Sequence, residues 1–528
     1  MHSNMKPFLA FLPIVLLAGV ANGQFLTPNI GSDGGGFLNG TTFINNGLVG
    51  AGRLSAGTLD SFGETLGAAS GLSISNWAWN GSNFSGTFNV LPDRGYNAGS
   101  FFSNYAARIH EVSFTFSPYT GAGPVGQTQI APTYTGTTTK LTYQDGLTTK
   151  FTTGLVPTGT STILGQTVGT VNAANGPGGL TTNLISFDAE AIHLFNDGSG
   201  YTSDEYGTYI ARFNSSKQIT GITQLPASAR PTDALPGAAA NFGASNTLGR
   251  NANQGLEGLS VSPDGNKLFV LMQSALVQDQ TSNPTRTNTR LYVYDISTPA
   301  LKDAPSIIGE YVVQLPTLDR DGTGGAADRT AAQSEIVMLS DTQFLMLPRD
   351  GNGLGSGDAR PAVFKVVSLV DIAGATNILG TYDATGNQIS PSGTLVGGII
   401  PAARTEVVNL LFTADLTKFG YNTNNAAKNI NTLSEKWEGM SLVEDISTLD
   451  PFDYFLFVAN DNDFQAQTVT MLDASGNLVS NPNGDPRDGG ITNDAQFLAY
   501  SVSIVPEPST LVTLLGGAAM LGLRRRRA

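Results

Sequence analysis

The 528-residue chain contains no cysteine, only three histidines, and only 13% charged residues. The absence of cysteine excludes disulfides, thiolate nucleophiles and cysteine-based zinc sites. A chain of this length can bury a large core without disulfides. The scarcity of histidine argues against a histidine-rich metal centre. A Ser-His-Asp triad would have only His110 and His193 to use, because His2 lies in a predicted leader.

Basic residues are also few, with 28 Lys and Arg against 42 Asp and Glu, for a net charge of −14. We therefore expect no binding to nucleic acid or to anionic membranes, whereas cations would be attracted. Glycine is abundant at 63 residues, and threonine is frequent. This composition favours strands and turns over exposed helices.

Both ends of the chain carry export-type patterns, although neither contains a long hydrophobic run. Lys6 precedes the apolar stretch 7–20, which is followed by small residues up to Gly23. This order predicts a signal peptide over residues 1–23.

The C-terminal pattern is Pro506-Glu507-Pro508, then an apolar segment over 511–523, then four arginines over 524–527. In this order, residues 505–528 resemble the PEP-CTERM sorting signal of Gram-negative bacteria. The resemblance implies recognition by an exosortase, transient membrane contact through the C-terminal helix, and delivery to the cell envelope or extracellular matrix. The alternative is an ordinary C-terminal membrane anchor.

The body of the chain, residues 24–504, contains a recurring acidic pattern. A glutamate opens a strand-like apolar run at Glu190, Glu257, Glu335 and Glu438, with a looser copy at Glu406. Each run belongs to a unit of three or four short strands joined by tight turns. The spacing of the glutamates exceeds the roughly 40–50 residues of a compact propeller blade, so the units must carry inserted loops.

We therefore predict an all-β fold, a β-propeller with enlarged loops on one face. A β-helix or a β-sandwich assembly is the alternative. Residues 132–182 form a Thr/Gly-rich insertion, in which Asp145-Gly146 predicts a hairpin turn. Residues 29–46 are rich in glycine and asparagine and predict a loop or a fraying first strand.

In a closed ring of sheets, a repeated strand end places the same corner of every unit at one rim. The recurring glutamates, together with the polar ends of the following runs, are therefore expected to gather around one opening. Carboxylates crowded in this way either bind a metal or have displaced pKa values.

Several motifs follow one another along residues 50–503. They are Leu91-Pro-Asp93-Arg94-Gly95, Asp188-Ala-Glu190-Ala-Ile192, Ser203-Asp204-Glu205-Tyr206-Gly207, Asn253-Gln-Gly255-Leu-Glu257-Gly258-Leu259, Pro348-Arg349-Asp350, Lys436-Trp-Glu438-Gly439 and Asn460-Asp461. Together they resemble the esterase-like domain of the phytase-like family. The resemblance implies phosphoester or related ester hydrolysis at clustered Glu and Asp residues. One departure is Ala191, because Gly258 and Gly439 follow the glutamates of the later copies.

These residues lead to a hypothesis of metal-assisted hydrolysis of a small ester or phosphoester. Hard oxygen ligands suit Ca²⁺ or another divalent cation such as Mg²⁺, and arginines offer planar donors to anionic oxygens. For each glutamate, the alternative is that it caps turn amides or pairs with a nearby base. We assign catalytic roles to Glu190, Glu205, Glu257, Glu438, Arg94 and Arg349, and metal ligation to Asp93, Glu335, Asp461 and Asp463.

A second hypothesis is a non-catalytic extracellular matrix propeller that binds exopolysaccharide or a protein partner. It rests on the export signals and on tryptophans that can serve as a carbohydrate platform. Trp77 and Trp79 are expected in the core, whereas Trp437 adjoins Glu438 and is expected to line the opening.

Overall fold

The structure is a computed structural model that describes the strand-rich body of the chain. The predicted signal peptide, and the predicted sorting segment beyond Pro506, lie outside the described residues. No helix in the described part is both long and apolar enough to cross a membrane. The described residues are 34–95, 97–98, 101–102, 104–174, 180–231, 246–423, 427–473, 475–481 and 487–506.

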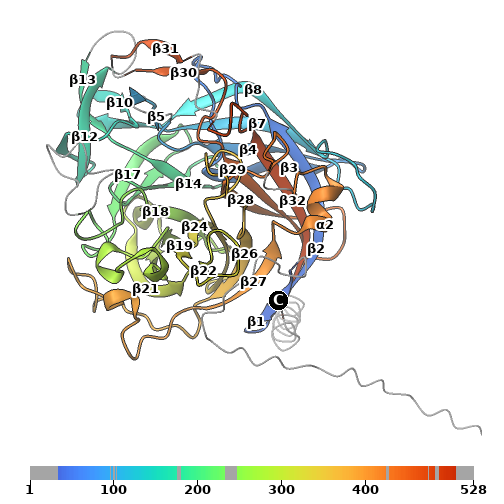
Figure 1. Ribbon diagram of the computed structural model, residues 1–528. Helices are drawn as coiled ribbons and strands as arrows, with labels where there is room; N and C mark the ends of the chain where they lie inside the picture. Colours follow the sequence, from blue (N-terminus) through green and yellow to red (C-terminus); the bar gives the residue numbers. More distant parts are fainter. Residues whose placement is uncertain are drawn as a thin grey trace, which may run out of the picture.

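Within these residues, five sheets surround a common centre (Figure 1). The first strand of each sheet contacts the first strand of the next sheet, and the fifth returns to the first. This cyclic order confirms the predicted all-β propeller and gives the described part five blades. The β-helix and β-sandwich alternatives are wrong. The inner strands are β3 (Gly71–Trp79), β14 (Ala189–Leu194), β18 (Leu256–Val261), β24 (Ala332–Met338) and β28 (Lys436–Glu444).

Each inner strand is followed by the outer strands of its own blade. Blade one continues with β4 (Phe84–Leu91), β7 (Arg108–Phe116) and β8 (Ile130–Lys140), and blade two with β15 (Gly200–Asp204), β16 (Tyr209–Phe213) and β17 (Gln218–Gln224). Blade three continues with β19 (Lys267–Met272), β20 (Asn288–Asp295) and β21 (Ser306–Gln314), and blade four with β25 (Gln343–Arg349), β26 (Val366–Asp371) and β27 (Ala403–Asn409). Blade five continues with β29 (Asp453–Asp461), β32 (Ala495–Pro506), β2 (Thr41–Leu54) and β1 (Gly36–Leu38).

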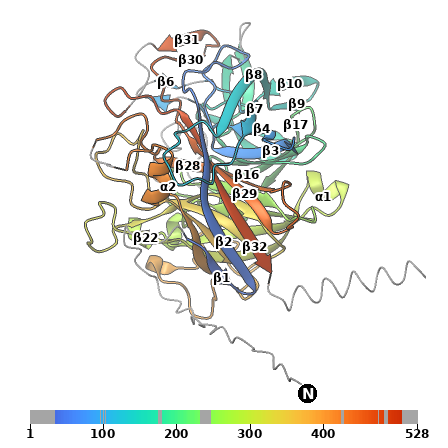
Figure 2. The same ribbon diagram turned by 90° about the vertical axis from the view of Figure 1, so that its right-hand side faces the viewer.

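Blade five joins the two ends of the described chain. The 14-residue strand β2 pairs antiparallel with β32, from Thr41 opposite Pro506 to Leu54 opposite Ala495. Figure 2 shows the two strands side by side along their length. The expectation of a loop or fraying strand over 29–46 is therefore wrong from Thr41 onward. Gly52 shows one reason for the glycines, since a Cβ there would lie 2.0 Å from the Ile130 carbonyl oxygen on β8.

The Thr/Gly-rich insertion contains the predicted hairpin. Strands β9 (Thr142–Asp145) and β10 (Thr148–Phe151) pair antiparallel around Asp145-Gly146. Strand β9 also pairs in parallel with β17, so the insertion widens blade two. A separate sheet follows in the order β11 (Gly159–Ile163), β12 (Gln166–Ala174) and β13 (Leu180–Ile185).

The remaining connections carry small elements. They are β5 (Asn97–Ala98) with β6 (Phe101–Phe102), β22 (Thr317–Leu318) with β23 (Arg329–Thr330), β30 (Val469–Leu472) with β31 (Leu478–Asn481), α1 (Pro299–Asp303), α2 (Thr413–Lys418), and the 3₁₀ turns η1 (Val277–Asp279), η2 (Asn283–Thr285) and η3 (Pro391–Gly393).

The core lies between neighbouring blades and is rich in aromatic side chains between blades five and one. The ring of Phe88 stacks on Phe114 at 3.7 Å and on Phe497 of blade five at 4.6 Å. Trp437 is fully buried, and its indole N–H donates to the Ser434 carbonyl at 3.1 Å. The expectation that Trp437 lines the opening is therefore wrong.

Candidate active site

Each of the four recurring glutamates lies at a β-bulge on an inner strand. The pairing register breaks around Glu190 on β14, Glu257 on β18, Glu335 on β24 and Glu438 on β28. A bulge places two residues opposite one and redirects a side chain that would otherwise follow the pleat. The recurring sequence pattern therefore marks a recurring backbone irregularity at the start of the inner strands.

A polar cavity of about 390 Å³ lies where the inner strands begin. Adjacent strands in each blade are antiparallel, so the start of an inner strand and the end of the next strand share one edge. All five blades contribute residues to this cavity, which we call the acidic pocket. Its lining residues are Asp93, Arg94, Gly95, Asp188, Glu190, Glu205, Asn253, Gln254, Glu257, Gln273, Ala332, Arg349, Lys436, Glu438, Asp463 and Arg487.

All six residues assigned catalytic roles from the sequence line the acidic pocket. Of the four assigned as metal ligands, Asp93 and Asp463 line it, and Asp461 contributes an oxygen close to both. Residues from 93 to 463 thus converge at one opening, as the repeated strand ends predict. Their individual roles stay predictions.

Glu335 and Glu406 lie elsewhere. The Glu335 carboxylate accepts hydrogen bonds from the backbone N–H groups of Leu259 at 3.0 Å and Ile336 at 2.9 Å. Glu335 thus caps backbone amides, which is the alternative stated for each glutamate in the sequence analysis. It is not among the residues that line the pocket. Glu406 lies on the outer strand β27, where it pairs with Arg404. The structure therefore brings neither glutamate to the pocket.

Burial disfavours the charged form of the pocket carboxyl groups. It raises the pKa of Asp93 and of Asp188 to about 7. Burial, with repulsion from Glu257, raises the pKa of Glu190 well above its usual range. Burial also raises the pKa of Glu257. These groups ionise fully near neutral pH only if a cation or a hydrogen-bond donor compensates their charge.

The pocket's own cations compensate part of this charge. Arg349, at the end of β25, forms an ion pair with Glu438 across the pocket. Arg94 follows β4, and its Nε lies 3.7 Å from Asp188 Oδ2. The Arg94 guanidinium also lies over the Tyr206 ring, 5.1 Å from its centroid, and bonds to the Tyr206 hydroxyl. Both arginines are thus held in fixed positions beside carboxylates.

Asp188, Lys436 and Arg487 also line the pocket, although no role is predicted for them from the sequence. Asp188 and Lys436 each precede a recurring glutamate by two residues, the spacing that puts side chains on one face of a strand. That spacing could have identified both. Arg487 lies in an irregular stretch before β32 and carries no such signal, because tertiary packing alone brings it to the pocket.

The class of protein is thus a β-propeller with a carboxylate-rich pocket formed by all its blades. The chain matches the family model named phytase-like and described as "Esterase-like activity of phytase" over residues 65–464, so it belongs to the phytase-like family. An uncharacterized secreted protein of Arthroderma benhamiae is 30% identical over 467 residues, which are 81% of this chain and 89% of that protein.

Two solved structures align with most of this chain at low similarity. A glycosyl hydrolase from Bacteroides ovatus has 9% identity and a TM-score of 0.31, covering 90% of this chain and 98% of that chain. The Dos1 propeller has 8% identity and a TM-score of 0.25, covering 86% of this chain and 94% of that chain.

Proposed function

We propose that the protein is an exported hydrolase that cleaves a phosphoester or related ester in the acidic pocket with the help of a divalent cation. The observation that carries this proposal is the convergence of carboxylates from different blades beside fixed arginines. Membership of the phytase-like family supports ester hydrolysis, and the secreted relative supports export.

The donor atoms of the pocket fit a hard cation. Carboxylate oxygens are the ligands that Ca²⁺ and Mg²⁺ prefer. When bound, such an ion polarises an ester oxygen and lowers the pKa of a water molecule. Within each of two groups of three carboxyl residues, one oxygen per residue lies within 4.8 Å of the others. The groups are Asp93, Asp461 and Asp463, and Asp188, Glu190 and Glu205.

The protein's own side chains supply the remaining chemistry. Glu257 lines the pocket and accepts a hydrogen bond from the Gln273 amide, so its ionised carboxylate is placed to take a proton from water. Arg94 and Arg349 offer planar N–H donors to the oxygens of an anionic substrate.

An assay on generic phosphoesters and carboxylic esters, with EDTA, Ca²⁺ or Mg²⁺, tests the proposal. We expect cation-dependent turnover that falls by about 10²-fold or more in Glu257→Gln, because an amide cannot take a proton. The matched control Glu406→Gln makes the same change on an outer strand and should retain activity. No turnover by the folded protein with either cation would exclude hydrolysis of these esters.

Glycan retention by Glu257→Gln without any turnover would favour the matrix-protein alternative. No described residue lining the pocket is aromatic, so the described lining offers no stacking platform for sugars.

The proposal of export includes removal of the C-terminal sorting segment by an exosortase. The last strand ends at Pro506, the first residue of the Pro-Glu-Pro sequence, so cleavage beyond it would leave the five sheets whole. Intact mass measurement of the exported protein tests this. We expect a product that lacks the C-terminal arginines, whereas a product that retains them would contradict the proposal.

A further inference from the structure

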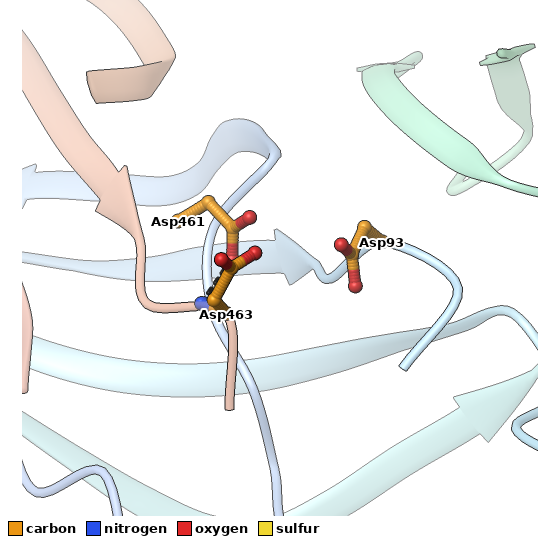
Figure 3. A group of neighbouring side chains, drawn as sticks. All are labelled: Asp93, Asp461 and Asp463. Carbon is orange, nitrogen blue, oxygen red and sulfur yellow. Dashed lines mark hydrogen bonds between the residues drawn. The ribbon is translucent and has the colours of Figure 1, made fainter. Parts of the chain in front are cut away.

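The two clusters of three carboxyl residues differ in the protein cations that already lie beside their oxygens. This difference decides which of them can take the cation of the proposed function, on which the inference rests. In the first group, Asp461 and Asp463 lie together at the end of β29, and Asp93 faces them from the loop after β4 (Figure 3).

The first group already contains protein cations. Lys436 Nζ lies 3.1 Å from Asp461 Oδ2 and 2.7 Å from Asp463 Oδ1. Arg487 Nη1 lies 2.7 Å from Asp463 Oδ2. Although burial opposes it, these two cations hold the pKa of Asp463 below its usual range. An ammonium group therefore lies where a metal ion would have to bind.

In the second group the three carboxyl groups outnumber the cations near them, which are Arg94 beside Asp188 and Arg250 near Glu205. Asp188 accepts the backbone N–H of Arg94 at 3.0 Å, and the Arg94 guanidinium approaches it only to 3.7 Å. Glu205 accepts the backbone N–H of Gly255 at 3.3 Å. Glu190 is only 6% exposed, and no described residue forms a hydrogen bond or ion pair with its carboxylate.

A buried carboxylate without a partner is strongly unfavourable unless it is neutralised. Glu190 lies beside two further carboxyl groups, so its burial is made worse by repulsion. A divalent cation among the three side chains would relieve both effects, and its open coordination positions would accept water and substrate oxygens.

We propose that Asp188, Glu190 and Glu205 form the one divalent-cation site of the acidic pocket, and that the Lys436 ammonium takes the place of a second ion beside Asp461 and Asp463. The site selects a hard cation of the Ca²⁺ or Mg²⁺ type. Because the Lys436 ammonium contacts both Asp461 and Asp463, the pocket binds one divalent cation per chain.

Calorimetric titration of the metal-free protein with Ca²⁺ or Mg²⁺ alone tests the number and location of the ions. We expect one ion per chain in the native protein. Glu190→Gln should weaken binding by more than about tenfold, while the matched control Glu406→Gln binds normally. Lys436→Gln should bind a second ion, because it leaves Asp461 and Asp463 without their ammonium.

The melting temperature separates ligation from a structural role. In EDTA, Glu190→Gln should melt at or above the native protein, because it removes a buried carboxyl group whose ionisation no described side chain supports. With Ca²⁺, only the native protein and Glu406→Gln should gain stability. A lower melting temperature of Glu190→Gln in EDTA would show that Glu190 is structural and would overturn the inference.

Binding of two cations per chain by the native protein would also overturn the inference, even if the enzyme proves cation-dependent. So would an affinity of Glu190→Gln for the cation equal to that of the native protein. Conversely, one ion bound through Glu190 without turnover of any ester would leave the inference standing and overturn the proposed function.

Discussion

Arg349 and Glu438 show how a buried ion pair compensates charge in the pocket. Their side chains are only 8% and 4% exposed, so each depends on the other for compensation. Removing one partner of a buried pair leaves an uncompensated charge, whereas removing both leaves none. The pair therefore stabilises the fold as well as placing a donor beside the pocket.

Arg349→Met should lower the free energy of unfolding by about 3–5 kcal/mol, because Glu438 would then be buried without its cation. The double variant Arg349→Met/Glu438→Gln should recover much of this loss. Chemical denaturation of the single and double variants measures the coupling. Equal stability of Arg349→Met and the double variant would show that the pair contributes nothing.

His110 is another buried titratable residue, and it is not among the residues that line the acidic pocket. Its ring nitrogens lie 3.2 Å from the Tyr105 hydroxyl and 2.8 Å from the Thr138 hydroxyl, and it is fully buried. Burial, with repulsion from Arg108, lowers the pKa of His110 to about 3. The folded chain therefore keeps this ring neutral where an unfolded chain would protonate it.

A lowered histidine pKa contributes stability above the unfolded pKa of about 6.5, and this contribution is lost as the pH falls toward about 3. Relative to His110→Gln, the native protein should lose about 1–2 kcal/mol between about pH 7 and about pH 5. Urea denaturation of both proteins at each pH checks this. The comparison cancels the pocket carboxyl groups, whose raised pKa values act in the opposite direction, and parallel pH profiles would contradict it.

At the scale of the strand, the sequence pattern identified four of the five described inner strands, because each of the four carries a glutamate at its β-bulge. The pattern did not distinguish Glu335, because the backbone amides that its carboxylate binds come partly from β18. It also missed blade one, where Ser70-Gly71-Leu72-Ser73 matches Glu257-Gly258-Leu259-Ser260 with serine in place of glutamate. A search for acidic residues alone cannot detect that unit.

The glycine after these positions has a packing role. A Cβ on Gly71 would lie 2.5 Å from the Glu190 carbonyl oxygen on β14, and a Cβ on Gly439 would lie 2.8 Å from the Leu72 Cβ on β3. Neighbouring inner strands therefore approach closely only where one of them lacks a side chain. In blade two the corresponding residue is Ala191 instead of glycine. Ala191 is fully buried and packs toward blade three.

Gly71→Ala should destabilise the protein by about 1–3 kcal/mol, because the new methyl group meets backbone rather than a movable side chain. The matched control Gly374→Ala places its methyl group in open space and should be nearly neutral. Thermal denaturation of both variants measures the difference. Equal melting temperatures would show that the inner strands can separate without penalty.

At the scale of the whole molecule, the sequence predicted a closed propeller but not the pairing of β2 with β32 that closes it. Local patterns report which residues form strands, but they do not report that β2 joins a sheet built from the last part of the chain. The glycine and asparagine content of β2 concealed a long strand, since those residues serve its bulges and its contact with blade one. The number of blades depends on this closure.

The closure makes the N-terminal strand necessary for the ring. Without β2, strand β32 would present an unpaired edge, which favours aggregation and removes the link between the two ends of the described chain. A chain beginning at Gly34 retains β1 and β2 and should melt as the full body does. A chain beginning at Ser55 should lose the cooperative thermal transition and elute as aggregate.

A peptide of residues 41–54 added during refolding should restore part of the monomer, because it can supply the missing strand by β-strand addition. Size-exclusion chromatography and circular dichroism measure both effects, and a scrambled peptide of the same composition is the control. If the chain beginning at Ser55 stays monomeric and melts cooperatively, β32 does not need its partner. The propeller would then hold together through the contacts of its inner strands alone.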